Sequence, residues 1–170
     1  MNWLPKSTGI WRICWQATTE NWAVSKFITQ CNGKKPSLTI VQVVKNNKKY
    51  IFGGYATKAW GGNEHWISAP GSFLFSLRNN DNLPPFKSPL KNENDASEIY
   101  PCIFGHGPLF GRGYDLYIGN NARSIIVSKA NIGVTYEAPP GYTQNKQKTQ
   151  SLLAGSLYFT PSEVEVLYLD

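Results

Sequence analysis

Short runs of β-branched and aromatic residues recur along the whole chain, and turn-forming residues separate them. Residues 38–44 and 50–57 are two such runs, with the polar segment 45–49 between them. Runs of this length, bounded by Gly, Pro and Asn, are typical of strands. The pattern predicts a mainly β chain, with 45–49 as the loop of a β-hairpin.

Alternation of apolar and polar residues predicts a strand at each end of the chain. Residues 10–17 alternate in this way, which places Trp11, Ile13 and Trp15 on one face. Residues 162–169 alternate as well. Further strands are expected at residues 72–77, a nearly continuous apolar run that predicts burial of both faces, and at 114–118 and 124–127.

One segment has the spacing of a helix. Apolar residues between Ala23 and Cys31 follow one face of a short amphipathic helix. The preceding Thr18-Thr19-Glu20 offers side chains that cap a helix start, and Asn32-Gly33 is expected to end the helix. With this helix, the strands predict a two-sheet antiparallel β-sandwich with a few short helices, of the α+β class.

Size and composition limit the chain to one compact domain. It has 170 residues, of which 41% are hydrophobic and 16% charged. This composition excludes an intrinsically disordered chain and a coiled coil. We expect an N-terminal extension over residues 1–9, a single domain over 10–170, and a long Asn- and Pro-rich loop at 78–101 within it.

The cysteines and the apolar runs bear on location. No apolar run approaches the ~20 residues of a membrane-spanning helix, and no signal peptide is recognisable at the N-terminus. Cys14, Cys31 and Cys102 are too few and too scattered for a disulfide framework or a zinc site. We therefore expect reduced packing thiols in an intracellular, cytoplasmic protein.

The net charge of +6 is unevenly distributed. Seven lysines and no acid lie between Glu20 and Glu64, whereas the last ten residues carry three acids and no base. The Lys stretch lacks Arg and regularly spaced aromatics, so nucleic-acid binding is not expected. A solvated face is the first interpretation, and an acidic protein or a lipid surface are the alternatives.

No catalytic constellation is recognisable, and we predict neither an enzyme nor a bound metal or cofactor. His65 and His106 are the only histidines, and neither has a second ligand at metal-binding spacing. Cys102 near His106 leaves a thiol-based reaction open, because a nearby cation would lower the thiol pKa. Glu163 and Glu165 lie about 7 Å apart on one strand face. A solvated edge strand is a simpler interpretation than a glycosidase pair.

Two groups of glycines predict special backbone geometry. Residues 105–113 contain four glycines without the ending of a phosphate-binding loop, so we expect a loop with positive φ beside a strand. Gly53-Gly54 indicates a bulge or a close backbone approach within a strand. Asp115, which follows the Gly-rich segment, is expected to accept hydrogen bonds from loop amides.

Eight stretches, in chain order, resemble the TLDc domain family, which is named for its association with TBC and LysM modules. Among them are Ile51-Phe-Gly-Gly-Tyr, Phe110-Gly-Arg-Gly-Tyr-Asp and Glu163-Val-Glu-Val-Leu. The others lie at residues 27–32, 38–41, 72–77, 133–142 and 153–159. The resemblance covers nearly the whole chain, and the order of the stretches carries it.

The resemblance implies a β-sandwich core and a family without an established active site. It also implies protection against oxidative stress and, as in several TLDc proteins, binding to the V-type ATPase. We therefore expect a non-catalytic interaction module that binds or regulates this ATPase through a protein subunit. The candidate partner-binding residues are His106, Arg112 and Asp115, followed by Glu163 and Glu165.

Two alternatives from other classes remain open. One is a thiol-dependent antioxidant enzyme that uses Cys102, ahead of Cys14 and Cys31. The other is a stand-alone glycan- or small-molecule-binding protein of defence or lectin type, which the 14% aromatic content allows. The oligomeric state has no recognisable signal.

Overall fold

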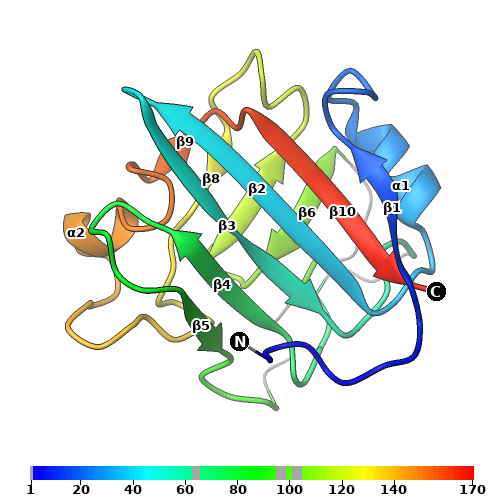
Figure 1. Cartoon of the computed structure of the whole chain (residues 1–170), viewed down its shortest axis with the longest axis horizontal. Coiled ribbons are helices and arrows are strands. Elements are labelled where there is room, and N and C mark those ends of the chain that lie inside the picture. Colours follow the sequence, from blue (N-terminus) through cyan, green and yellow to red (C-terminus); the bar gives the residue numbers. More distant parts are fainter. Residues whose placement is uncertain (1, 63–65, 95–98, 101–104) are drawn as a thin grey trace.

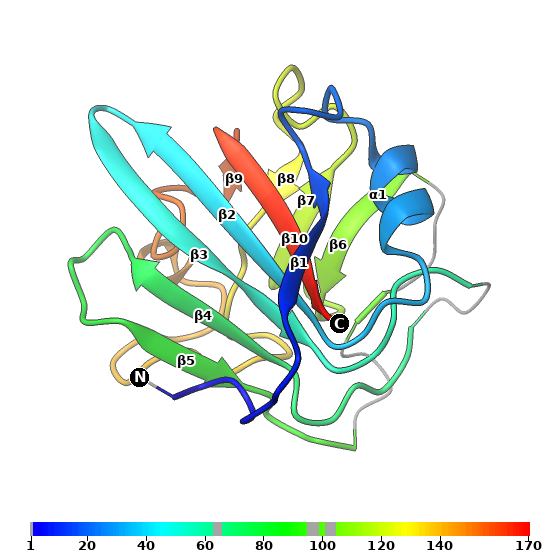
Figure 2. The same cartoon turned by 45° about the vertical axis from the view of Figure 1, so that its right-hand side comes forward.

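The computed structural model describes the chain except for residues 1, 63–65, 95–98 and 101–104. Within the described residues, ten strands form two antiparallel sheets, which confirms the expected mainly β sandwich (Figure 1). The larger sheet has the order β1-β10-β2-β3-β4-β5, and the smaller has the order β6-β7-β8-β9. Figure 2 shows the two sheets as separate layers, with α1 beside β1 and β6.

The bounds of the elements are as follows. The larger sheet consists of β1 (Trp11–Gln16), β2 (Ser37–Lys45), β3 (Lys48–Ala56), β4 (Phe73–Arg78), β5 (Phe86–Pro89) and β10 (Glu163–Leu169). The smaller sheet consists of β6 (His106–Phe110), β7 (Leu116–Gly119), β8 (Ser128–Lys129) and β9 (Tyr158–Phe159). The helices are α1 (Val24–Cys31) and α2 (Gln147–Gln150).

The predicted hairpin at 45–49 is confirmed. β2 and β3 pair along their whole length, and Asn46 and Asn47 turn the chain with φ of 51° and 59°. Asn tolerates this left-handed region better than most residues, and two such residues give the turn whose twist suits a hairpin. The short apolar strand at 72–77 is also confirmed as β4.

Several sequence expectations are wrong. The segment 78–101 is not a loop throughout, because β5 forms inside it and pairs with β4. Residues 124–127 form no strand, and β8 begins at Ser128. β10 is not an edge strand, because it lies between β1 and β2. Thr18–Glu20 do not cap α1; the amide of Val24 donates to Asn120 Oδ1 at 3.1 Å instead.

β1 departs from simple alternation because a bulge lies between Ile13 and Trp15. A bulge adds one residue to one strand and so changes which side chains face inward. Trp15 is 1% exposed, whereas Ile13 is 51% exposed. The expectation that these two residues share a face is therefore wrong, and Cys14 lies in the buried core.

Aromatic rings fill the space between the layers. Trp15, Phe27, Trp60 and Phe110 form a series of ring contacts with centroid distances of 5.4–5.6 Å. Gly54 makes room for this series, because a Cβ there would lie 2.6 Å from the Phe110 ring. This is the close approach that Gly53-Gly54 predicts.

Cys14 and Cys31 form a disulfide, which overturns the expectation that all three cysteines are reduced. Cys14 lies on the bulged part of β1, and Cys31 ends α1, which packs on β1. Their Cα atoms are 5.3 Å apart although the residues are 17 apart in sequence. Cys102 lies outside the described residues.

The disulfide is relevant to the expected location. Disulfides are rare in cytosolic proteins, where thiols are kept reduced. The pair Cys14–Cys31 thus does not favour the cytoplasm, and the location stays a prediction. Among the described residues, no helix is long and apolar enough to cross a membrane.

We predict that the disulfide stabilises the fold. Replacing both residues, as Cys14→Ser with Cys31→Ser, should lower the free energy of unfolding by about 3 kcal/mol, because the unfolded chain regains the freedom of a closed loop. Urea denaturation with and without dithiothreitol measures this effect. The reductant should destabilise the wild type and leave the double variant unchanged. Equal stability of the wild type under both conditions would show that the cysteines are not paired.

Candidate functional site

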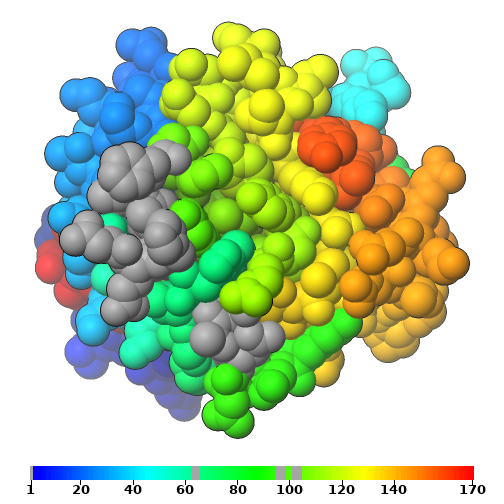
Figure 3. Space-filling view, turned by 180° about the vertical axis from the view of Figure 1, so that it is seen from behind, coloured from blue at the N-terminus to red at the C-terminus, as the bar shows by residue number. Residues whose placement is uncertain are grey.

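The outer side of the smaller sheet presents a cluster of aromatic rings and cations. Tyr117 on β7 is paired with Lys129 on β8, which is paired in turn with Tyr158 on β9. Leu116 and Ile118, on either side of Tyr117 in β7, are buried in the core, so Tyr117 points outward. We call the cluster the aromatic–cationic surface, and it consists of Trp66, Tyr100, His106, Arg112, Tyr114, Tyr117, Lys129 and Tyr158. It lies on the side that Figure 3 views, where the green-yellow and yellow segments occupy the centre.

The rings of this surface support one another. His106 Nδ1 lies 3.1 Å from Tyr117 Oη, and the two ring centroids are 5.4 Å apart. The Tyr100 ring centroid lies 5.7 Å from that of His106, and the Trp66 ring centroid lies 5.0 Å from that of Tyr100. Tyr114 completes the series with an edge contact to Tyr117. These contacts hold the side chains in place in the absence of any ligand.

The two cations of this surface lie over aromatic rings. The Arg112 guanidinium is 6.0 Å from the Trp66 ring centroid. Lys129 Nζ is 5.4 Å from the Tyr114 ring and 5.9 Å from the Tyr158 ring. No carboxylate of the described residues forms an ion pair with either cation. Burial, and secondly the electrostatic effect of Tyr114, raises the pKa of the Tyr117 hydroxyl.

Asp115 lies beneath this surface and has no exposed area. Its carboxylate accepts hydrogen bonds from the amides of Val134, Thr135 and Tyr136 at 2.9, 3.0 and 3.2 Å. This confirms that Asp115 accepts bonds from loop amides. It also means that the predicted contact between Asp115 and a partner is wrong, because the carboxylate fastens residues 134–136 to β7 inside the protein.

Burial controls the ionisation of Asp115. Removal from water raises the pKa of this carboxyl to about 6, although the three backbone amides lower it. The ordinary value is near 4. Folding therefore favours the protonated form, and the stability this adds is complete below about pH 4 and is lost as the pH rises through about 6.

Glu163 and Glu165 lie elsewhere, on the outer face of the larger sheet. Both accept hydrogen bonds from Gln16 Nε2, at 3.2 and 3.3 Å. Glu163 also accepts from the amide and the hydroxyl of Thr18. The pair thus fastens the end of β1 to β10. The structure does not bring it together with His106 and Arg112.

Of the predicted residues, His106 and Arg112 share one surface, linked through Trp66 and Tyr100. His106 belongs to strand β6 and not to a loop. Cys102 and His65 lie outside the described residues. Sequence reasoning missed Lys129, Trp66 and the four tyrosines of this surface, since they come from separate segments. The described residues contain no group of three or more His, Cys, Asp or Glu that would hold a metal.

The family profile of the TLDc domain matches residues 1–169 of the 170-residue chain. The chain belongs to the TLDc domain family. No curated protein shows a significant sequence match to it. The aromatic–cationic surface of this TLDc domain includes Arg112 and Tyr114, which belong to the stretch Phe110-Gly-Arg-Gly-Tyr-Asp.

We predict that Asp115→Asn destabilises this TLDc domain in a pH-dependent way. The amide can accept with one oxygen only, and its NH2 group faces amide donors, so a buried polar group loses its partner. The gap in unfolding free energy between wild type and variant should narrow by about 2 kcal/mol between pH 4.5 and pH 7, because the wild type alone loses the protonation advantage.

Urea denaturation at both pH values measures this gap. Glu137→Gln, which removes an exposed carboxyl next to the 134–136 segment, controls for the loss of one negative charge. A gap that widens toward pH 7 would contradict the account, because it would mean that the amides lower the pKa of Asp115 below its ordinary value.

Proposed function

We propose that this TLDc domain is a non-catalytic protein-interaction module that binds the V-type ATPase through the aromatic–cationic surface. Family membership supports the class of partner. The observation that carries the choice of surface is the pair of cations, Arg112 and Lys129, that lie among packed aromatic rings without an ion-pair partner among the described residues. Trp, Tyr and Arg are the residues that most often dominate binding energy at protein interfaces.

The arrangement suits an acidic partner surface. A carboxylate that approaches Arg112 or Lys129 gains a charge-assisted hydrogen bond. Lys129 is half-buried beside two rings, and a bond formed there is screened less than one in open water. Since the rings already contact one another, they lose little freedom on binding. Asp115 contributes indirectly, because its hydrogen bonds to residues 134–136 hold the start of β7, the strand that carries Tyr117.

In this proposal the domain performs no chemistry of its own, and it contributes to oxidative-stress protection through the ATPase. The packing of His106 supports this view, because its described neighbours are the rings of Tyr100 and Tyr117. Cys14 and Cys31 are paired with each other and are not free thiols. The carboxylate of Asp115 is occupied by backbone amides.

Native mass spectrometry of the purified chain mixed with the soluble V1 sector tests the proposal. A stoichiometric complex is expected at physiological salt. The double variant Arg112→Glu with Lys129→Glu should weaken it at least about tenfold, since both cations become repulsive toward an acidic partner.

The matched control is Lys26→Glu with Lys35→Glu, which makes the same change in net charge at two exposed lysines of the Lys-rich stretch. This control should bind like the wild type. No complex at tens of micromolar would remove the ATPase as the partner. Equal weakening by both double variants would show that binding follows net charge and not this surface.

A further inference from the structure

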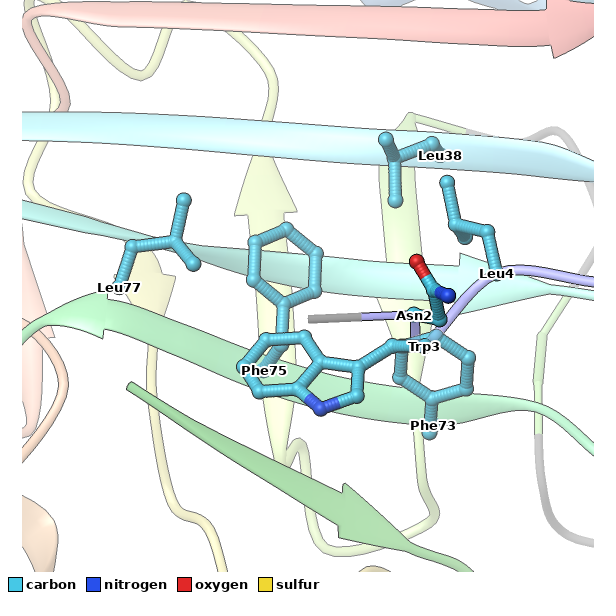
Figure 4. A pocket seen from close by; sticks show the side chains of 7 residues that line it. All are labelled: Asn2, Trp3, Leu4, Leu38, Phe73, Phe75 and Leu77. Carbon is cyan, nitrogen blue, oxygen red and sulfur yellow. The ribbon is translucent and has the colours of Figure 1, made fainter. Parts of the chain in front are cut away.

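The outer face of the larger sheet carries an apolar groove of about 390 Å³, far from the aromatic–cationic surface. Figure 4 shows the side chains that line it, which come from β2, β4 and the N-terminal segment. They are Asn2, Trp3, Leu4, Leu38, Phe73, Phe75 and Leu77. The N-terminal segment runs beside the β4–β5 end of the sheet, so Trp3 and Leu4 form one wall (Figures 1 and 2).

Strand register builds the floor of this groove. Leu38, Tyr55 and Phe73 are neighbours across β2, β3 and β4. Phe75 is paired with Gly53, and a Cβ at Gly53 would lie 2.7 Å from Phe75 Cζ. Because Gly53 has no side chain, the Phe75 ring packs directly against the backbone of β3. Phe73 and Phe75 are only 2% and 5% exposed, because Trp3, Leu4 and Leu38 pack against them.

The groove continues into a basic hollow. Leu77, which is 40% exposed, also lines a second depression of about 400 Å³. This depression is lined by Lys48, Lys49 and Arg78, and by asparagines at positions 47, 79 and 82. A bulge in β4 joins the two hollows, because Ile51 is paired with Arg78 and Phe52 with Ser76, which leaves Leu77 as the additional residue.

Two of the three cations in the basic hollow are available to a ligand. Lys48 donates to the carbonyl of Asn80 and lies over the Tyr50 ring. Lys49 and Arg78 are exposed, and no carboxylate of the described residues forms an ion pair with them. The apolar groove therefore ends at two positive charges that have no ion-pair partner among the described residues.

We propose that these two hollows together bind a single-chain anionic amphiphile of the medium-chain fatty acid class. The alkyl chain lies along β4 from Phe73 to Leu77, where it displaces the Trp3 side chain that covers these rings in the free protein. The carboxylate pairs with Arg78 and Lys49. The four-residue span measures ~13 Å, which accommodates about ten carbons of an extended chain. Because Phe73 and Phe75 lie under Trp3 and Leu4, they suit a chain that inserts into the protein and not insertion of the protein into a bilayer.

Isothermal titration calorimetry with dodecanoate below its micelle concentration tests the proposal, and amide and indole NMR shifts locate the site. Saturable 1:1 binding is expected, with shifts at Trp3, Leu38 and Leu77. From octanoate to dodecanoate, affinity should rise by up to about fourfold per methylene. Absence of 1:1 binding, or shifts confined to other surfaces, would overturn the proposal.

The position of the carboxylate is tested by the surface variant Arg78→Gln with Lys49→Gln. It should weaken dodecanoate binding at least about tenfold and leave the weaker binding of 1-dodecanol unchanged. The matched control is Lys87→Gln, because Lys87 Nζ lies 4.2 Å from the Phe73 ring at the other end of the groove. A larger loss in the control would overturn the assigned orientation. Binding to phosphatidylserine vesicles without binding of dodecanoate would overturn the proposal, because the groove would then contact a membrane surface and not a single ligand.

Discussion

The close contact between the two sheets at Gly54 is the constraint on which the rest of the structure depends. The Phe110 ring from β6 occupies the space that a side chain at Gly54 would fill. This ring then continues the aromatic series through Trp60 and Phe27 to Trp15, which connects both sheets with α1. Because the inner faces of the two sheets pack against each other, the outer face of each sheet presents its own set of side chains.

The two outer sides differ in how their charges are arranged. On the smaller sheet, the cations lie over aromatic rings, and Asp115 fastens the backbone beneath them. On the larger sheet, the cations lie at one end of an apolar groove, while Glu163 and Glu165 hold β1 in place toward the opposite edge of the same face. The first arrangement suits a broad acidic protein surface, and the second suits a single elongated ligand.

The sequence predicts those parts of the fold that local patterns determine. Residues 38–44 and 50–57 are rich in β-branched and aromatic residues, and the intervening asparagines tolerate positive φ, so the hairpin is predictable. The bulge after Ile13 is not, because one inserted residue leaves the local composition unchanged while it moves Cys14 into the core. The disulfide is not predictable either, since it depends on how α1 packs against β1.

The candidate site was predictable only in part. His106 and Arg112 stand out because they lie within the Gly-rich segment 105–113, but the rings that surround them come from four other places in the chain. Such a cluster exists only after the strands have paired. Asp115 shows the opposite case, since its hydrogen-bonding role follows from its position after the Gly-rich segment, whereas its complete burial depends on the segment 134–136.

Hydrogen–deuterium exchange of this TLDc domain, free and bound to the V1 sector, tests the central claim most directly. The account predicts that binding slows exchange in peptides that cover residues 106–117 and 128–130, and leaves β2 and β4 unchanged. Slower exchange confined to β2, β4 and the N-terminal segment would contradict it, because the partner would then occupy the larger sheet and not the aromatic–cationic surface.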